Sequence, residues 1–392
     1  MSIPAPKVEI GFDLTDSPIG PFLRLDNPVS GKLDDPSWTL GGTIFFDVTD
    51  RMVSISISRG KNRQLDQYDV GLANVVLQNN DRAFDPTYEA SPFYGNIIPK
   101  RSLRISSGGE FTFVGVSDDW NLQYEPNGQS LVSLSATDAF SYFQTQTISP
   151  RTNDVQKSGE RINAILSLPE VNWPVENRTI DTGIQTLVGD TITDATNALA
   201  YFKQVTASEP GSFFISRGGN VVFQDRRNAA ESGDVALADD GTGIPYIGMR
   251  IEYGSELLYN EIEISSPAGT AIANDLTSQQ EYGVLNFTQS DLLINDIADV
   301  QQLATFYASK FSQPEYRFES VEILLDELTP TQQADLLDLD MGSVVRIRFT
   351  PNGIPPAIER SAEIIRIDHG VTTTSHVISL GFSTLDLSLI HI

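Results

Sequence analysis

Histidine is the residue type in this chain best suited to metal binding or proton transfer, because the sequence has three histidines and no cysteine. His369 and His376 lie seven residues apart on either side of an expected turn, and Asp368 is the obvious further ligand nearby. A zinc site needs three or four ligands at suitable spacing. We therefore expect no metal site here, and instead a hairpin whose polar ends face solvent or a neighbouring subunit. His391 lies in the terminal tail and supports no site.

Pairs of carboxylates could hydrolyse a glycosidic bond, with one group protonating the leaving oxygen and the other acting as base or nucleophile. The sequence offers three such pairs, namely Asp118–Asp119, Asp239–Asp240, and Asp338 with Asp340. Among 52 acidic residues such pairs are expected by chance, and the first stands directly before Trp120 in an expected turn. We interpret all three pairs as parts of solvated loops and helix caps.

Two further kinds of site find no support. A serine triad needs a histidine close to a serine and an aspartate, and only three histidines exist. A phosphate-binding loop needs a lysine after its glycines, whereas Gly108–Gly109 and Gly218–Gly219 are expected to be hairpin turns. We assign no catalytic, cofactor-binding or metal-binding residue, and we predict a protein that is not an enzyme and carries no cofactor.

Composition limits the partners of the chain. Its 392 residues suffice for two or three domains, and 52 acidic against 26 basic residues give a formal net charge of −26. Phosphate contacts need clustered lysine and arginine, so a general nucleic-acid binder and docking on an anionic membrane are disfavoured. Without cysteine, disulfides and thiolate metal sites are excluded. No signal core or membrane-spanning window is present, and we expect synthesis in the cytoplasm without membrane insertion.

The first third of the sequence predicts short β-strands. Met52–Ile57 alternates apolar and polar residues, as a half-buried strand does. Similar stretches are 70–77, 103–105, 111–116 and 131–135, with a tight turn at Pro126–Gly128. Many short strands separated by turns favour a barrel or a sandwich. A short helix capped by Thr137 or Asp138 is expected to follow.

The middle of the sequence predicts a small α/β module. Ser158 is a candidate N-cap for a helix that carries Ile162, Ile165 and Leu166 inward and stops before Pro169, and a second helix is expected from about Asp190. A hairpin is predicted at 212–225 around Gly218–Asn220, and a linker or surface loop at 234–243.

The last third predicts strands with inserted helices. A helix from about Asp296 to Phe311 places Val300, Leu303, Tyr307 and Phe311 inward, and Thr329–Pro330 begins another helix. The expected strands are 259–264, 321–325, 342–349, 363–367 and 377–380. Two β-rich ends around an α/β centre give a coarse division into residues 1–150, 151–250 and 251–392.

Arg82 could pair with Asp81 and Asp85 and so order the loop before Pro86. Exposed pairs of this kind contribute about 0–1 kcal/mol, so the expected role is loop ordering or subunit contact. The three tryptophans, Trp38, Trp120 and Trp173, are expected to be core or interface anchors.

Six segments, in order, resemble one protein family. They are DVTDRMVSISISRG at 47–60, LQNNDRAFDP at 77–86, SPFYGNIIPKRSLRI at 91–105, LLYNEIEI with NDLTSQQEYG within 257–283, LLDLDMGSVVRI at 336–347, and IIRIDHGVTTTSHVISLGFS at 364–383. Together they are similar to the minor tail proteins of siphophages, the tail-tip baseplate hub family. Lys100–Arg101 departs from the family pattern, as do the long segment before Phe45 and the apolar tail 387–392.

The resemblance implies a mainly β (α+β) fold, with two tail-tube-like β-barrel or sandwich domains that flank the α/β module. It also implies a homotrimer whose six barrels form a pseudo-six-fold ring in the virion. The implied partners are the distal tail protein, the tail tube protein, the tape measure protein and other minor tail or central fibre proteins. DNA would pass through the ring without specific binding, and the acidic charge would keep it from adhering.

Two alternatives stay open at this point. A distal-tail-type ring protein would form a hexamer in place of a trimer. A carbohydrate-binding or carbohydrate-hydrolysing tail-tip protein would need a groove with exposed aromatic side chains, and for hydrolysis a carboxylate pair at suitable separation.

Overall fold

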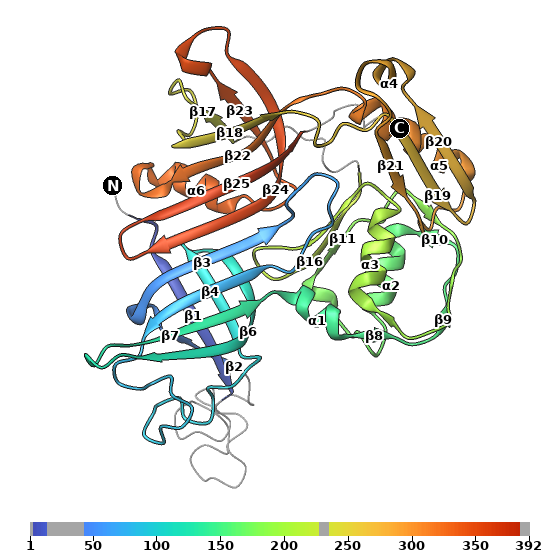
Figure 1. Ribbon diagram of the computed structural model, residues 1–392. Helices are drawn as coiled ribbons and strands as arrows, with labels where there is room; N and C mark the ends of the chain where they lie inside the picture. The colour runs from blue at the N-terminus through green and yellow to red at the C-terminus, as the bar shows by residue number, and fades with distance from the viewer. Residues whose placement is uncertain (1–2, 14–42, 227–234, 385–392) are drawn as a thin grey trace.

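One large sheet dominates the computed structural model of the protein, which describes residues 3–13, 43–226 and 235–384 (Figure 1). Within these residues the strand order is β18-β22-β25-β24-β3-β4-β7-β6-β5-β1-β2, and β23 and β17 extend from β24. All neighbouring pairs in this sheet are antiparallel except β17 with β23. The mainly β fold class predicted from the sequence is therefore confirmed.

The N-terminal strands form one half of this sheet. They are β1 (Pro6–Asp13), β2 (Thr43–Asp47), β3 (Met52–Gly60), β4 (Leu72–Gln78), β5 (Ser102–Ser107), β6 (Glu110–Tyr124) and β7 (Ser130–Thr137). Their apolar residues alternate with polar ones, so that Val132, Leu134 and Ala136 of β7 are buried while their neighbours face outward. The buried face packs with Val8, Ile10 and other residues of β1 into one hydrophobic cluster.

The C-terminal strands form the other half. They are β17 (Ala236–Ala238), β18 (Gly248–Tyr253), β22 (Tyr316–Leu324), β23 (Val344–Phe349), β24 (Ile358–Thr372) and β25 (His376–Thr384). Helix α6 (Pro330–Asp338) begins at the Thr329 N-cap with proline in its first turn, as predicted. Leu336 and Leu337 of α6 belong to the hydrophobic cluster of this half.

The two halves join where β3 pairs with β24 along seven residues, from Arg366 opposite Gly60 to Thr372 opposite Ser54. Gly60 has a φ of +123°, and a Cβ at this position would lie 2.2 Å from the carbonyl oxygen of Ile365. Only glycine allows this close approach of the two strands. The seam therefore depends on a contact between residues that are about three hundred positions apart in the sequence.

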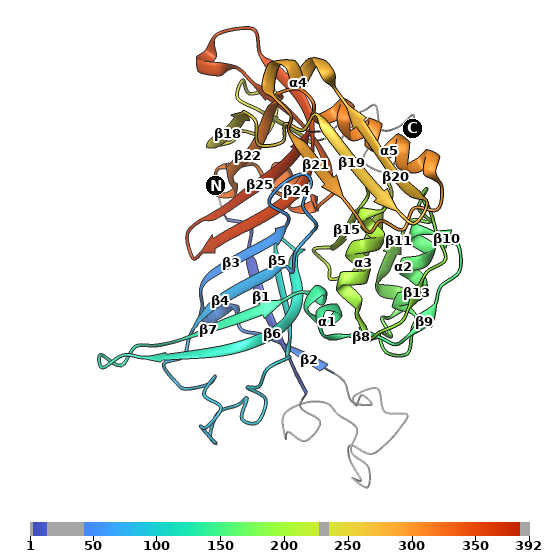
Figure 2. The same ribbon diagram turned by 45° about the vertical axis from the view of Figure 1, so that its right-hand side comes forward.

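The middle module has its own core beside the N-terminal half (Figure 2). Its helices are α1 (Ala139–Thr145), α2 (Ser158–Leu166) and α3 (Ala198–Ala207), and its main sheet is the hairpin β15 (Ser212–Ile215) and β16 (Val221–Gln224) with β11 (Arg178–Ile180). The short pairs are β8 (Thr147–Ile148) with β14 (Thr196–Asn197), β9 (Arg151–Thr152) with β13 (Thr191–Ile192), and β10 (Gln156–Lys157) with β12 (Thr186–Leu187).

A fourth hydrophobic cluster lies under a three-stranded sheet and a long helix. The sheet contains β19 (Glu261–Ser266), β20 (Gly269–Asn274) and β21 (Asn286–Gln289), and the helices are α4 (Leu276–Tyr282) and α5 (Ile297–Phe311). Asp296 caps α5, and Val300, Leu303, Tyr307 and Phe311 point into the core, as predicted. The division of the chain at residues 150 and 250 remains a prediction.

Four local predictions were wrong. Asp118–Asp119 lies inside β6, at a bulge beside Ser117, and not in a turn. The second helix begins at Ala198 after the N-cap Asn197, whereas Asp190 pairs with the buried guanidinium of Arg161 and Ile192 belongs to β13. Within the described part of 234–243, β17 is a strand paired with β23. Lys157, not Ser158, is the N-cap of α2, since the Ser158 hydroxyl donates to Glu209.

Candidate functional site

The loop that joins β4 to β5, residues 79–101, holds the ion pair predicted around Arg82. Arg82 donates to Asp85 through Nη2 at 2.6 Å and Nε at 2.9 Å, whereas Asp81 pairs with Arg51 at 2.6 Å. Arg82 therefore pairs with one of its two predicted partners. The backbone of Arg82 is in the left-handed region at a φ of +61°, so the pair stabilises an unusual turn.

Asp85 is the centre of this loop. Besides Arg82, it accepts hydrogen bonds from Thr87, through the backbone at 2.9 Å and the hydroxyl at 2.7 Å, and from the Tyr124 hydroxyl at 2.9 Å. The Thr87 hydroxyl and the Arg82 guanidinium together hold the pKa of Asp85 well below its usual range. The Asp85 carboxylate therefore stays ionised, and these hydrogen bonds occupy its oxygens. It orders the loop and is a poor proton donor.

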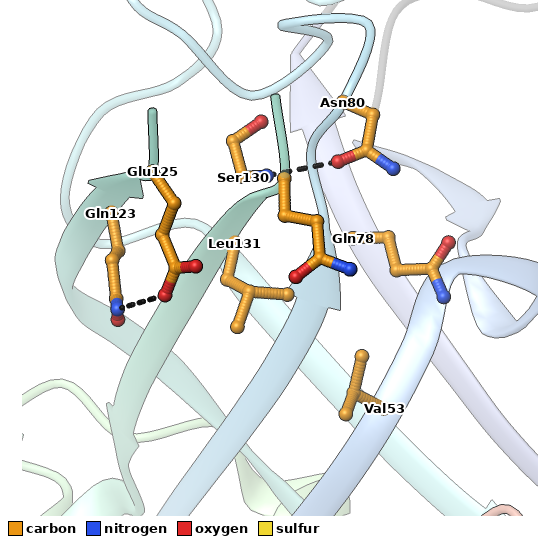
Figure 3. Close-up of a pocket in the computed structure, with 8 residues that line it drawn as sticks. Val53, Gln78, Asn80, Gln123, Glu125, Ser130 and Leu131 are labelled. Carbon is orange, nitrogen blue, oxygen red and sulfur yellow. Dashed lines mark hydrogen bonds between the residues drawn. The ribbon is translucent and has the colours of Figure 1, made fainter. Parts of the chain in front are cut away.

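A shallow groove of about 190 Å³ lies next to this loop, on the solvent-facing side of the sheet (Figure 3). Gln78 of β4 and Gln123 of β6 are both register partners of Leu131 on β7, so the three side chains form a row across the sheet. Eight side chains line the groove: Val53, Gln78, Asn80, Gln123, Glu125, Gln129, Ser130 and Leu131. We call this set the amide groove, since carboxamides predominate in it.

Hydrogen bonds fix part of the wall of the amide groove. The Asn80 side-chain oxygen accepts from the backbone of Ser130 at 2.9 Å, and the Gln123 amide donates to Glu125 at 3.3 Å. A second hollow of about 410 Å³ shares Asn80, Glu125, Gln129 and Ser130 with the amide groove, and it adds Arg82, Asp85, Tyr124 and Gly128. The two hollows meet at the end of the β6–β7 hairpin, but Gln123 and Tyr124 are successive residues of β6, so their side chains lie on opposite faces of the sheet.

The two histidines predicted at the ends of a hairpin lie in the interior, which corrects the expectation that they face solvent. His369 and His376 are 5% and 0% exposed, and their Nδ1 and Nε2 atoms are 3.1 Å apart. The Ser107 hydroxyl lies 3.3 Å from His376 Nδ1. Burial lowers the pKa of His376 to about 4, and burial together with the His376 charge lowers the pKa of His369 well below its usual value.

A buried ion pair near the seam was missed at the sequence level. The Arg59 side chain is 2% exposed and lies 2.9 Å from Asp340, which also accepts from the backbone of Arg217 at 2.7 Å. Arg217, in the β15–β16 turn, also pairs with Glu110 at 2.6 Å and Asp338 at 2.5 Å. Strand periodicity offered a signal, because Ile55, Ile57 and Arg59 share one face of β3.

Each candidate carboxylate pair has at least one member with a structural partner. Asp118 pairs with Lys100 at 2.6 Å, Asp239 accepts from the backbone of Thr350 at 2.7 Å, and Asp240 pairs with Arg348 at 2.7 Å. Asp338 and Asp340 face the two arginines Arg217 and Arg59. Among residues 3–13, 43–226 and 235–384, no group of three or more acidic or histidine side chains could hold a metal ion.

Two of the tryptophans are anchors, as expected. Trp120 Nε1 donates to the carbonyl of Ile98 at 3.0 Å, and its ring stacks on Phe84 at 6.0 Å between centroids. Trp173 donates to Asn177 at 3.2 Å and packs edge-on against Phe143. Trp38 and His391 lie outside the described residues, as does most of the segment before Phe45 and the tail from Leu387. No helix in the described part of the chain is long and apolar enough to cross a membrane.

Sequence comparison finds no relative: no family model matches the chain. No curated protein matches it either.

Solved structures do share its fold. A tail protein from Neisseria meningitidis MC58 has a TM-score of 0.61 at 10% identity, over 87% of this chain and 94% of that one. The 43 kDa tail protein of prophage MuSo2 from Shewanella oneidensis has a TM-score of 0.59 at 13% identity, over 87% and 94%. The prophage tail protein gp18 from Listeria monocytogenes EGD-e has a TM-score of 0.52 at 12% identity, over 88% and 94%.

At sequence identities of 10%, 13% and 12%, the similarity to these three structures shows a shared fold. The chain therefore has the mainly β fold of phage tail proteins, which confirms the coarser part of the resemblance read from the sequence.

Proposed function

We propose that this protein is a structural component of a phage tail, the baseplate hub at the tail tip of a siphophage. The observation that carries the proposal is the extent of the fold likeness, which takes in 87% of this chain and 94% of the Neisseria and MuSo2 tail proteins. The shared fold therefore takes in most of this chain and nearly all of each of the two tail proteins. The protein would close or extend the tail tube and join the distal tail ring to fibre or receptor-binding parts.

The proposed working form is a homotrimer in the virion. Each subunit would contribute its two β-rich ends, so that three chains build a pseudo-six-fold ring on the hexameric tube. The amide N–H and carbonyl groups of an edge strand are a template for pairing with another chain. Strand β18 is such an edge, since among the described residues its register partners lie on β22 alone.

Exposed apolar side chains at the same edge support a protein contact there. Ile247, just before β18, is 57% exposed, and Tyr253 at its end is 69% exposed. The two side chains lie at opposite ends of β18, where a partner strand paired along this edge would cover both of them. The partners proposed for such surfaces are a second copy of the chain, the distal tail protein, the tail tube protein and other minor tail or central fibre proteins.

The net charge of −26 suits a tube through which the tape measure protein and DNA pass, because like charge keeps DNA from adhering. The proposed role is mechanical and needs no catalytic centre. Asp118, Asp340 and the pair of His369 with His376 have structural partners, which supports a mechanical role for these residues.

The location can be tested on intact particles. Antibodies raised against the purified chain are expected to label the end of the tail away from the head in electron micrographs. Labelling of the head, of the whole tail shaft or of no particle would contradict the proposal. A distal-tail-type hexameric ring would be labelled at the same end, so it must be separated by copy number.

A further inference from the structure

The hairpin made by β23 and the first residues of β24 projects from the C-terminal half, at the top of the molecule in Figure 1 and Figure 2. The two strands pair from Val344 opposite Glu363 to Phe349 opposite Ile358, and residues 350–357 connect them. We call residues 344–361 the arginine arm. Strand β17 flanks only its base, and the tip is open to contact with another molecule.

The arginine arm reverses the charge balance of the chain. It contains three arginines, Arg346, Arg348 and Arg360, and a single carboxylate, that of Glu359. The chain as a whole has 52 acidic and 26 basic residues. Because complementary charges attract and like charges repel across an interface, an acidic surface is the contact that this arm favours.

Two of the three arginines have no carboxylate partner within residues 3–13, 43–226 and 235–384. The exposed Arg346 side chain makes no hydrogen bond or ion pair there. Arg360 is also exposed and donates only to the carbonyl oxygen of Glu359, at 3.0 Å. Arg348 differs, since it pairs with Asp240 at 2.7 Å and with the Glu359 carboxylate. The arm therefore carries two positive charges that the chain itself leaves unpaired.

Other accessible arginines in the described chain are paired. Arg51 lies 2.6 Å from a carboxylate oxygen of Asp81, and Arg63 lies 2.8 Å from one of Glu256. In a chain with an excess of carboxylates, an accessible arginine readily finds a partner nearby. The unpaired guanidinium groups of the arm are thus a local feature that calls for a partner from outside the chain.

The two unpaired guanidinium groups lie on opposite faces of the arm. Arg360 is the register partner of Ile347, a buried core residue, so it is on the core-side face at its exposed rim. Arg346 faces the other way, between Ala236 of β17 and Ser361 of β24. These small neighbours leave a hollow of about 450 Å³ at the base of the arm. A side chain of a partner can enter this hollow beside Arg346.

The tip of the arm is apolar and conformationally restricted. Ile354 is 68% exposed, and Pro351, Pro355 and Pro356 lie in the same connecting loop. Proline fixes its φ near −65°, so a loop with three prolines loses less conformational entropy when it docks. An isoleucine held out on such a loop gains free energy when a partner covers it.

We propose that the arginine arm docks on an acidic surface of a second copy of this chain, with Arg346 and Arg360 facing its carboxylates and Ile354 buried at the contact. The inference rests on the self-assembly proposed above and names the element that makes the contact. A second copy is the occupant that the charges favour, because each copy has twice as many acidic as basic residues. An arm that meets a different surface of the next copy makes a heterologous contact, and such contacts can close a ring.

Charge reversal in the full chain tests the arm. Sedimentation over a concentration series gives the concentration at which half of the chains are assembled. We expect Arg346→Glu/Arg360→Glu to raise this concentration about tenfold or more, since attraction becomes repulsion. Arg346→Lys/Arg360→Lys keeps both charges and should stay within about threefold of the wild type. The matched control is Lys7→Glu/Lys100→Glu, which changes the net charge equally at exposed lysines of the N-terminal half.

Cross-linking locates the contact without any change of charge. The chain has no cysteine, so Ile354→Cys provides a single thiol at the tip of the arm for a photoreactive maleimide. Isotopically labelled and unlabelled copies of this variant are mixed, assembled and illuminated. We expect cross-links that join a labelled to an unlabelled copy, at a segment rich in aspartate and glutamate.

Several results would overturn the proposal. One is that Arg346→Glu/Arg360→Glu assembles as the wild type does, and loss of binding to duplex DNA in that case would assign the arm to DNA. Another is that the lysine control weakens assembly equally, which would show that net charge alone acts. A third is that the Ile354→Cys cross-links stay within one copy. Circular dichroism shows whether each variant is folded. A wild-type chain that never assembles would overturn the proposed function as well, whereas the other results leave it standing.

Discussion

The loop at 79–101 and the seam between β3 and β24 both contain an arginine–carboxylate pair, but in opposite environments. In the loop, the side chain of Arg82 is 50% exposed, and its partner Asp85 is three residues away. At the seam, the side chain of Arg59 is 2% exposed, and its partner Asp340 comes from a distant part of the chain. The first pair orders a local turn, whereas the second holds two halves of the molecule together.

Because the two environments differ, an arginine–carboxylate pair contributes differently to stability in the loop and at the seam. Water screens the Arg82–Asp85 pair, so its attraction is small and is offset by the ordering of two side chains. The Arg59 charge has lost its water, and its attraction to Asp340 offsets a large desolvation penalty. Removal of one partner therefore matters most at the seam.

The largest expected effect is that of Asp340→Asn. This change leaves the buried Arg59 guanidinium without its counter-charge and disturbs the backbone donor of Arg217, so we expect a loss of about 3–5 kcal/mol in the free energy of unfolding. Urea denaturation followed by circular dichroism measures it. In Arg59→Met/Asp340→Asn the unpaired charge is gone, and the loss should be smaller than the sum of the single losses. A loss below about 1 kcal/mol for Asp340→Asn would mean that the buried pair at the seam contributes no more to stability than an exposed pair does.

The histidines beside the seam predict a loss of stability in acid. His376 has a pKa of about 4 in the folded chain and an ordinary value of 6.5 when unfolded. The contribution of His376 is fully present above pH 6.5 and is lost as the pH falls from 6.5 toward 4, by about 2 kcal/mol between pH 7 and pH 5. Arg59 faces His369 and opposes its protonation, whereas Asp326 near His376 favours it.

Urea midpoints measured at several pH values check this prediction. In His376→Asn the loss of stability between pH 7 and pH 5 should be smaller than in the wild type, since one titrating group is missing. The carboxylates of the chain titrate in both proteins and cancel in this comparison. Equal losses in the two proteins would show that the histidine pair does not govern the acid response.

A smaller effect is expected in the loop from Asp85→Ala. Two hydrogen bonds from Thr87 and one from Tyr124 lose their acceptor along with Arg82, so about 1–2 kcal/mol should be lost. Thermal unfolding provides the measurement. Asp81→Ala, which removes the exposed pair with Arg51 and one long hydrogen bond from the Ala83 backbone, is the matched control. A loss as large as that of Asp340→Asn would remove the distinction between the two regions.

The smallest effect is expected from Arg82→Ala, a loss of stability smaller than that of Asp85→Ala, which decreases as salt is added. The same denaturation assay at low and high salt measures it. A loss of several kcal/mol that does not depend on salt would show that this exposed pair carries more of the stability than its environment indicates.

Features that depend on local sequence could be predicted. The starts of α5 and α6 could be located because Asp296 and Thr329 are residue types that cap helices. The hairpin around Gly218–Asn220 could be predicted from its turn residues. The Arg82–Asp85 pair was also predicted, because its members are three residues apart. Each of these features is decided by residues within one or two turns of chain.

Features that depend on distant residues could not be predicted. The seam requires β3 to lie against β24, and the amide groove requires residues of β4, β6 and β7 to meet in one register. The start of α3 was predicted too early, at Asp190. This residue instead forms an ion pair with Arg161 on α2. The burial of His369 and His376 was missed although each shares its strand face with apolar neighbours, Ile367 and Val371 in one case and Ile378 in the other.

The claim at the centre of this account is that the protein works by assembling with copies of itself in a phage tail. Native mass spectrometry of the purified full chain tests it most directly. We expect a complex of three copies. A particle of six copies would indicate a distal ring in place of a hub, and a chain that stays monomeric at every concentration would contradict the central claim.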